Sequence, residues 1–120
     1  MSIMTIACYR PKKGKKNKLH RMMRKHLPIL REQGLATDRE SVIMEAKDGT
    51  VLEVFEWKSK SAVKNAHKNY AVLEMWGEFS EACDYISLKD VPESSNLFAG
   101  FAPFKIYTPM QMLKYNRSGM

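Results

Sequence analysis

His67 is the side chain whose type and surroundings could do chemistry most directly. It lies in a predicted helix, close to Ala66 and Tyr70 on the apolar side of that helix. A neutral imidazole in such a place can accept a proton from a phenolic or enolic substrate. The resulting phenolate or carbanion reacts with dioxygen by electron transfer far better than the neutral acid does. We therefore predict His67 as a catalytic base, with a structural hydrogen bond at a helix bend as the alternative role.

Large aromatic side chains could provide flat apolar walls for a planar ligand. Trp57 ends a predicted strand, and Trp76 lies in the helix that follows it. We expect a small hydrophobic or aromatic molecule to bind between the sheet and the helices, although the same side chains would also suit an ordinary core. His26 could instead satisfy a backbone carbonyl that Pro28 leaves free. The residues predicted to line the pocket are Tyr9, Met23, His26, Trp57, Tyr70, Trp76 and Phe79.

Two acids, Glu53 and Glu56, interrupt the apolar strand predicted at residues 51–57. Side chains alternate between the two faces of a strand, so these two point in opposite directions. At least one therefore faces inward or towards a dimer seam, where a carboxylate is seldom buried without a partner. A salt bridge with Arg39 or Lys47 is the expected arrangement.

Several common site chemistries have no counterpart in this sequence. No His-Glu-x-x-His or comparable ligand spacing occurs, so neither a structural nor a catalytic metal is expected. Glycine-rich phosphate loops and a serine-centred nucleophile elbow are also missing, and no cofactor is predicted. Cys8 and Cys83 do not form a Cys-x-x-Cys pair, and we expect both to be reduced and packed.

The elements that must position these residues follow a βαββαβ order, which is typical of an α+β, ferredoxin-like fold with an antiparallel sheet. Strands are predicted at 3–9, 41–46, 51–57 and 84–88, and helices at 15–32 and 62–83. Apolar residues of the first helix recur on one helical face, with Pro28 inside the pattern. The second helix changes its apolar phase near Asn69-Tyr70, which predicts two segments joined at a bend. Asp48-Gly49 predicts a hairpin with a tight primed turn.

The chain of 120 residues fits one domain with a short tail. We assign residues 1–104 to the ferredoxin-like domain and residues 105–120 to a C-terminal extension that is partly disordered. Phe98, Phe101, Phe104 and Tyr107 recur every three residues across this boundary. Such a spacing suits a fifth strand or an arm that docks on a partner subunit.

The net charge of +7 comes from one segment of the chain. Residues 10–25 hold nine Lys or Arg and no acid, whereas the rest has 11 basic and 13 acidic residues. This segment could attract an anionic partner or simply solvate a helix face. Specific nucleic-acid binding is not expected, because the strand at 51–57 carries two acids and lacks the Lys/Arg-Gly-Phe pattern of RNA-recognition modules.

Nothing in the sequence predicts a membrane segment. No apolar run reaches the ~18 residues that a membrane-spanning helix needs. The apolar start of the chain has no basic residues ahead of it, so it is interpreted as a first strand and not as a signal peptide. We therefore expect a cytoplasmic protein.

A family resemblance rests on short stretches spread along the chain: Tyr9-Arg10-Pro11, the links at 34–39 and 47–50, Phe55 to Lys60, and Ala66-His67 with Trp76. Over about residues 3–104 these resemble the antibiotic biosynthesis monooxygenase-like family of dimeric α/β-barrel proteins. The resemblance implies a homodimer in which two sheets face each other to form a barrel. It also implies a small-molecule pocket between sheet and helices in each subunit.

Activities differ among the proteins of this family. Some oxidise polyaromatic compounds without metal or flavin, and others degrade haem, process small signalling molecules or have no known activity. The haem-degrading members use an Asn, a Trp and a His, whose positions here are Tyr9 or Arg10, Ala66 and Trp76. Haem degradation is therefore not expected. The resemblance implies a cofactor-independent monooxygenase-like protein, with a non-catalytic binding or stress-related dimer as the alternative.

Overall fold

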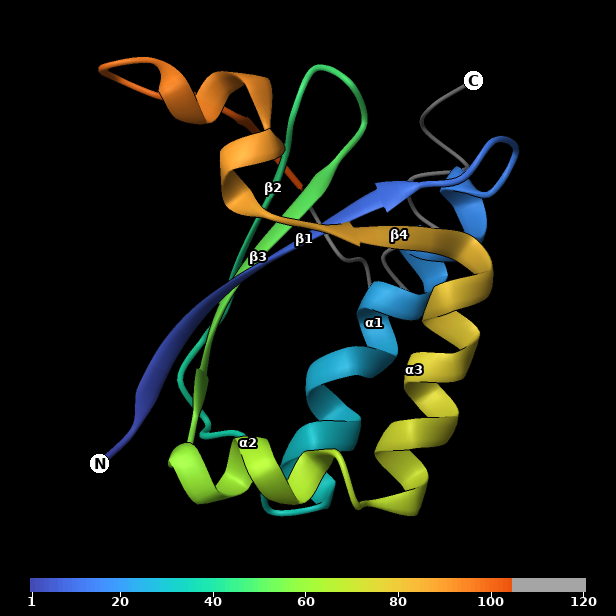
Figure 1. Ribbon diagram of the computed structural model, residues 1–120, viewed down its shortest axis with the longest axis vertical. Helices are drawn as coiled ribbons and strands as arrows, with labels where there is room; N and C mark the ends of the chain where they lie inside the picture. Colours follow the sequence, from blue (N-terminus) through green and yellow to red (C-terminus); the bar gives the residue numbers. More distant parts are fainter. Residues whose placement is uncertain (105–120) are drawn as a thin grey trace, which may run out of the picture.

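A five-stranded antiparallel sheet and three α-helices make up the structure, a computed structural model that describes residues 1–104 (Figure 1). The predicted extension at 105–120 lies outside the described residues. The strand order β4-β1-β3-β2-β5 contains the β4-β1-β3-β2 arrangement of a ferredoxin-like α+β fold, which confirms the predicted fold class. The elements are β1 (Ile3–Pro11), α1 (Lys16–Glu32), β2 (Val42–Glu45), β3 (Val51–Trp57), α2 (Lys60–Ala66), α3 (Tyr70–Ala82), β4 (Cys83–Ile86), the short 3-10 helices η1 (Leu88–Asp90) and η2 (Pro92–Ser95), and β5 (Ala102–Pro103).

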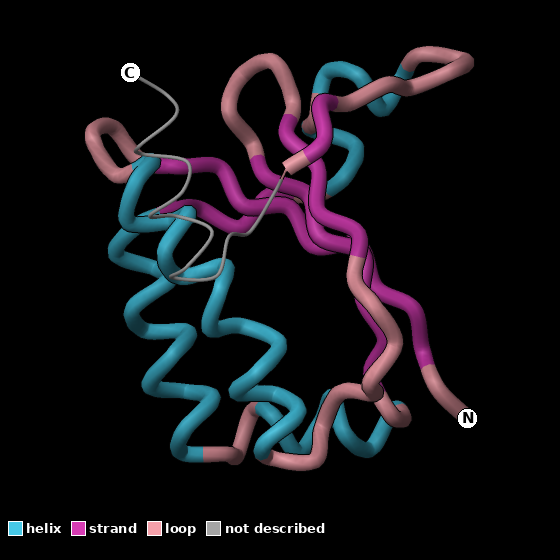
Figure 2. The backbone as a smooth tube through the Cα atoms, turned by 180° about the vertical axis from the view of Figure 1, so that it is seen from behind, coloured by secondary structure: helices cyan, strands magenta, loops and turns pink. Residues whose placement is uncertain are grey.

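The helices cover one face of the sheet. α1 and α3 pack against each other on this covered face, and α2 closes one end of the layer (Figures 1 and 2). The main core lies between this helix layer and alternate residues of the strands, since side chains one position apart point to opposite faces. Members of this core from the sheet and the helices include Val51, Phe55, Leu19, Leu30, Val72 and Phe79.

The first helix is held by its apolar face and by the turn that ends it. The buried positions of α1 are spaced as the sequence predicts, and Pro28 lies inside the helix. Gly34 follows with a φ of +74°, its N–H donates to Arg31 O at 2.9 Å, and Leu35 N–H donates to Leu30 O at 2.8 Å. These two bonds form a Schellman motif, which satisfies carbonyls that the helix end leaves free.

The predicted break in the second helical region is confirmed. α2 begins after Ser59, whose hydroxyl accepts the Ala62 N–H at 3.0 Å. α3 begins after Asn69, whose side-chain oxygen accepts the Val72 N–H at 3.1 Å. Each cap satisfies a backbone donor that a helix start leaves unpaired, so two separate helices form. No helix within residues 1–104 is long and apolar enough to cross a membrane.

The hairpin between β2 and β3 has a different turn from the predicted one. Gly49 N–H donates to Ala46 O at 3.0 Å, and Ala46 N–H donates to Thr50 O at 2.8 Å. Gly49 has a φ of +91°, whereas Asp48 has a negative φ. Both primed two-residue turns need a positive φ at the first central position, which here is Asp48, so the prediction of that turn is wrong. The chain forms a three-residue loop with glycine in the left-handed position, and the Asp48 carboxylate accepts the Thr50 N–H at 2.9 Å.

The face of the sheet away from the helices is largely open, and we call it the open face. At one end Val91, held by η1 and η2, covers Cys8 in a small second core. Further along the sheet Met4, Ile6 and Val42 are 52%, 48% and 55% exposed. Apolar side chains in neighbouring strands therefore form a continuous surface that water covers in the single chain.

Replacing glycine with alanine should have opposite effects at two positions. A Cβ at Gly34 is strained by the left-handed backbone, so Gly34→Ala should lower the free energy of unfolding by about 1 kcal/mol. Gly77 lies inside α3 with no atom within 4 Å of an added Cβ, so Gly77→Ala should raise it by up to about 1 kcal/mol. Urea unfolding measures both changes. Shifts of the same sign would contradict this account of the α1 terminus.

Candidate functional site

Three polar side chains meet in the core between the sheet and α1, and we call them the buried polar cluster. Tyr9 comes from β1, His26 from α1 and Glu53 from β3. The Tyr9 hydroxyl donates to Glu53 Oε1 at 2.9 Å, and His26 Nδ1 lies 2.7 Å from the same oxygen. Their exposed fractions are 1%, 4% and 0%. The carboxylate of Glu53 on β3, which has no contact with water, thus contacts one residue of β1 and one of α1.

Local sequence patterns place each of these side chains in the core. Tyr9 lies opposite Val51 and Glu53 lies opposite Ala7 in the β1–β3 ladder, so both point to the helix-covered face. His26 lies on the apolar face of α1, between Met23 and the next turn of buried residues. The register of one strand pair and the periodicity of one helix are therefore enough to bring the three groups together.

The carboxylate of Glu53 is only partly satisfied by its neighbours. Tyr9 and His26 both approach Oε1, whereas Oε2 is buried and has no hydrogen-bond partner within residues 1–104. The contact from His26 Nδ1 is close, but it lacks the direction of a hydrogen bond. Burying a charge without full compensation costs several kcal/mol, and such strained polar groups concentrate at functional sites. Glu53 Oε2 is therefore a candidate acceptor for a hydrogen bond or a proton in this layer.

Aromatic rings surround the buried polar cluster. The His26 ring lies 5.2 Å from Phe55 and 5.6 Å from Phe79 between centroids, in edge-to-face geometry. The Tyr9 ring stacks on Phe79 at 5.3 Å. Burial, and next the negative charge of Glu53, raise the pKa of Tyr9 well above its usual value. Tyr9 is therefore a permanent hydrogen-bond donor and does not act as a base.

Four of the predicted pocket residues lie in the main core: Tyr9, Met23, Trp57 and Phe79. His26 is also buried, and its ring contacts Phe55 and Phe79 of this core. Trp76 is partly buried and packs against that core from α3. The structure thus brings most of the predicted set into one layer between sheet and helices. Whether they line a ligand pocket stays a prediction.

His67 and Tyr70 lie outside this group. His67 is exposed at the end of α2, where its Nδ1 contacts Val63 O at 2.9 Å, and its ring lies 5.1 Å from Trp76. Tyr70 is 89% exposed at the start of α3. The short turn between α2 and α3 directs both side chains away from the buried polar cluster. The geometry therefore favours the alternative role for His67, a structural hydrogen bond at the helix bend.

Glu53 is the residue of this site that the sequence analysis did not assign to chemistry. Its signal is visible, because Glu53 interrupts the otherwise apolar inward series Val51, Phe55 and Trp57. The expectation that one of the two strand acids faces inward is confirmed. Its partners could not be named, since Tyr9 and His26 reach it only through tertiary packing.

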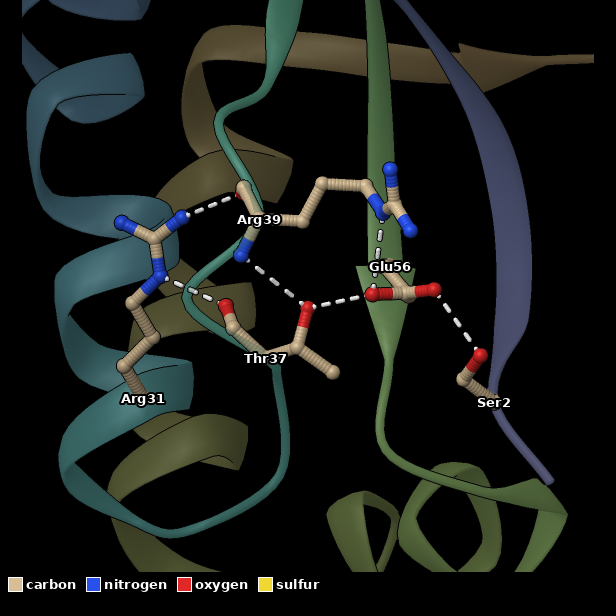
Figure 3. A network of polar contacts seen from close by, with 5 residues as sticks. All are labelled: Ser2, Arg31, Thr37, Arg39 and Glu56. Carbon is tan, nitrogen blue, oxygen red and sulfur yellow. Dashed lines mark hydrogen bonds and ion pairs between the residues drawn. The ribbon is translucent and has the colours of Figure 1, made fainter.

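The second strand acid, Glu56, belongs to a separate polar network shown in Figure 3. Its carboxylate accepts hydrogen bonds from Thr37 at 2.7 Å, Ser2 at 2.8 Å and Arg39 at 3.1 Å. Arg31 donates to the carbonyls of Thr37 and Arg39, both at 2.8 Å. The hydrogen bonds from Thr37, Ser2 and Arg39 lower the pKa of Glu56. This network fixes the α1–β2 connection to the sheet and confirms the predicted Arg39 salt bridge.

Both cysteines are free and buried, as expected. Burial, and next the charge of Asp84, raise the pKa of the Cys83 thiol to about 11. Burial also raises the pKa of Cys8. A thiolate is the reactive form, so neither side chain is a good nucleophile at neutral pH. Within residues 1–104, no group of three or more His, Cys, Asp or Glu side chains could hold a metal ion.

Comparison with known proteins supports the fold. No family model and no curated protein matches the chain. The solved structure of Rv0793 from Mycobacterium tuberculosis is similar, with a TM-score of 0.56 and 14% sequence identity over 72% of this chain and 94% of Rv0793. At this identity the similarity shows a shared fold alone.

The hydroxyl of Tyr9 should contribute measurably to stability through Glu53. Tyr9→Phe removes one of the two groups that face Oε1 and should lower the free energy of unfolding by about 1–3 kcal/mol. Tyr85 lies directly opposite Tyr9 on β4, and its hydroxyl has no hydrogen bond within residues 1–104. Tyr85→Phe is therefore the matched control and should change the free energy of unfolding by less than about 0.5 kcal/mol. Equal losses in the two variants, measured by urea unfolding, would refute this role of Tyr9.

Proposed function

We propose that the protein is a homodimer that binds a small aromatic hydroxy compound next to the buried polar cluster and oxidises it without a cofactor, with Glu53 as the base. The observation that carries the proposal is an oxygen of Glu53 that lies in a layer of aromatic side chains and has no hydrogen-bond partner among residues 1–104. The resemblance to the antibiotic biosynthesis monooxygenase-like family implies a small-molecule pocket between sheet and helices, which supports the same layer. The fold shared with Rv0793 is compatible with it.

The two oxygens of Glu53 suit different tasks. Tyr9 and His26 both approach Oε1 and fix the orientation of the carboxylate. Oε2 is buried and has no hydrogen-bond partner within residues 1–104. In this proposal it accepts a proton from the hydroxyl of a substrate that enters the layer between sheet and helices. A base works best when its position is set by other groups and its own lone pair is unused. His26, beside Oε1, can help to hold the carboxylate in place while the proton moves to Oε2.

The chemistry that fits this site is the oxidation of a hydroxyarene to a quinone. Glu53 takes the hydroxyl proton, and the resulting phenolate gives electrons to dioxygen. A C–O bond forms at a ring carbon, whose C–H bond then breaks to leave a carbonyl. The second oxygen atom leaves as water, with one proton returned by Glu53 and one from that ring carbon. The substrate supplies all the electrons that reduce this oxygen, so the reaction needs no external reductant.

The open face supports the dimeric part of the proposal. Its apolar side chains Met4, Ile6 and Val42 are about half exposed in the single chain. Soluble monomers seldom leave a continuous apolar surface of this kind in water. Sheets commonly pack face to face, and a second copy would bury both open faces at once. The same pairing is what the family resemblance implies.

The catalytic part is tested by oxygen consumption with 1-naphthol as the probe. Glu53→Gln keeps the size of the side chain and removes its basicity, so it should lower kcat by at least about 100-fold. His67→Ala is the comparison variant, and its rate should equal that of the unchanged protein, because His67 lies at the surface. Circular dichroism confirms that both variants are folded.

Each outcome of this comparison is informative. Equal rates with and without Glu53→Gln would overturn its role as base. A rate that falls only in His67→Ala would restore the assignment made from sequence. Binding of 1-naphthol without any oxygen uptake would replace the enzyme with the alternative, a non-catalytic binding dimer.

The dimeric part is tested by light scattering after size exclusion. Ile6→Lys places a charge on the open face and should convert the dimer to a monomer. Leu73→Lys is the matched control, because Leu73 is exposed to nearly the same extent, 46% against 48%, but lies on α3. It should remain dimeric. A monomeric unchanged protein, or dissociation in both variants, would contradict the interface.

A further inference from the structure

A groove lies along the seam between α1 and α3 and is lined by residues of both helices. Figure 1 shows these two helices side by side on one face of the sheet. It consists of two adjoining hollows of about 450 Å³ and 260 Å³. The two share Met22, Lys25 and Glu78, so they form one continuous depression, which we call the seam groove. Its larger half has the volume of a small-ligand site.

One end of the seam groove is strongly basic. Its walls carry Lys18, Arg21, Arg24 and Lys25, against the single acid Glu78. Lys18 is bonded to Glu81 at 2.7 Å, whereas neither Arg21 nor Lys25 forms an ion pair with any residue in 1–104. Arg21 and Lys25 therefore line the hollow without an ion-pair partner among the described residues.

The rest of the seam groove combines an apolar floor with acidic walls. The floor contains Met22 and Met75, both buried, with Ile29 beside them. Glu32, Glu74 and Glu78 stand around this half. The charge thus reverses along the groove, from basic near the start of α1 to acidic near its end.

We propose that the seam groove binds a small amphiphilic anion. A single carboxylate, sulfonate or phosphate group lies between Arg21 and Lys25, and its apolar body covers the floor formed by Met22 and Met75. Paired cations beside a flexible methionine surface suit such a ligand, because the charged head gains charge-assisted hydrogen bonds and the body loses contact with water.

The acidic half limits the class of ligand. An extended polyanion such as a nucleic acid would place further phosphates next to Glu32 and Glu74, where like charges repel. A ligand with one anionic end avoids that repulsion. The site is also separate from the buried polar cluster, since His26 faces the sheet while its neighbour Lys25 faces the groove.

The probe for this proposal is 8-anilinonaphthalene-1-sulfonate, which carries one sulfonate on an aromatic body. Its fluorescence rises when it binds, and the double variant R21Q/K25Q should weaken binding about tenfold or more, since a hydrogen bond between charged groups contributes about a factor of ten. N-phenyl-1-naphthylamine has the same body without the sulfonate, and R21Q/K25Q should leave its binding unchanged. Inorganic phosphate at high concentration should compete only with the sulfonate probe.

The matched control is K13Q/K89Q, which removes the same charge from two exposed positions outside the groove. It should change binding of the sulfonate probe by less than twofold. Equal weakening in both double variants would show a general charge effect and overturn the site. Binding that is unaffected by R21Q/K25Q would place the probe elsewhere, on the open face or near Glu53, and would also overturn it.

Discussion

The burial of Glu53 is the constraint on which the arrangement of the helix-covered core depends. A carboxylate in the middle strand of the sheet has no contact with water, so its stability rests on the groups that approach it. Tyr9 can do so only if β1 and β3 keep their register, and His26 only if α1 keeps its rotation. One charge therefore specifies how three elements meet. An apolar residue at this position would remove the cost of burial, but it would also remove the contacts that fix how the three elements meet, together with the proposed proton acceptor.

The alternation of β3 extends this constraint to the other side of the sheet. Residues on either side of Glu53 point to the opposite face, where Leu52 is buried beneath the η1–η2 segment and Val54 lies beyond that cover. The helices thus cover one face of the sheet, whereas the η1–η2 segment covers only one end of the other face. Glu56 lies on this second face and is held by the network that fixes the α1–β2 connection. The open face is therefore apolar in its centre and polar at one end. In the proposed dimer this pattern would favour one orientation of the second copy over a slipped one.

Most of the fold could be predicted from local sequence patterns, whereas the residues of the candidate site are brought together only by tertiary packing. The order of elements, the apolar face of α1 and the break before α3 all follow from periodicity and capping within short windows. The contact between His26 and Glu53 depends on how a helix sits on a sheet, which no local window contains. The exposure of His67 could not be predicted for a related reason, since each residue turns a helix by about 100° and the last residue of a helix can face either way. The turn type predicted for Asp48-Gly49 was wrong because this pair fits more than one loop geometry.

α1 shows how one helix can serve two surfaces without coupling their chemistry. Its inward face supplies His26 to an environment of aromatic rings with little water, where electrostatic interactions are strong. Its outward face supplies Arg21 and Lys25 to solvent, where charges are screened over about 8–10 Å at physiological salt. Met22 lies at the boundary, buried beneath the groove yet part of the core. The basic residues of this cluster that lie within α1 therefore have a structural reason for sharing one side: a helix that gives one side to an apolar core can concentrate cations only on the other.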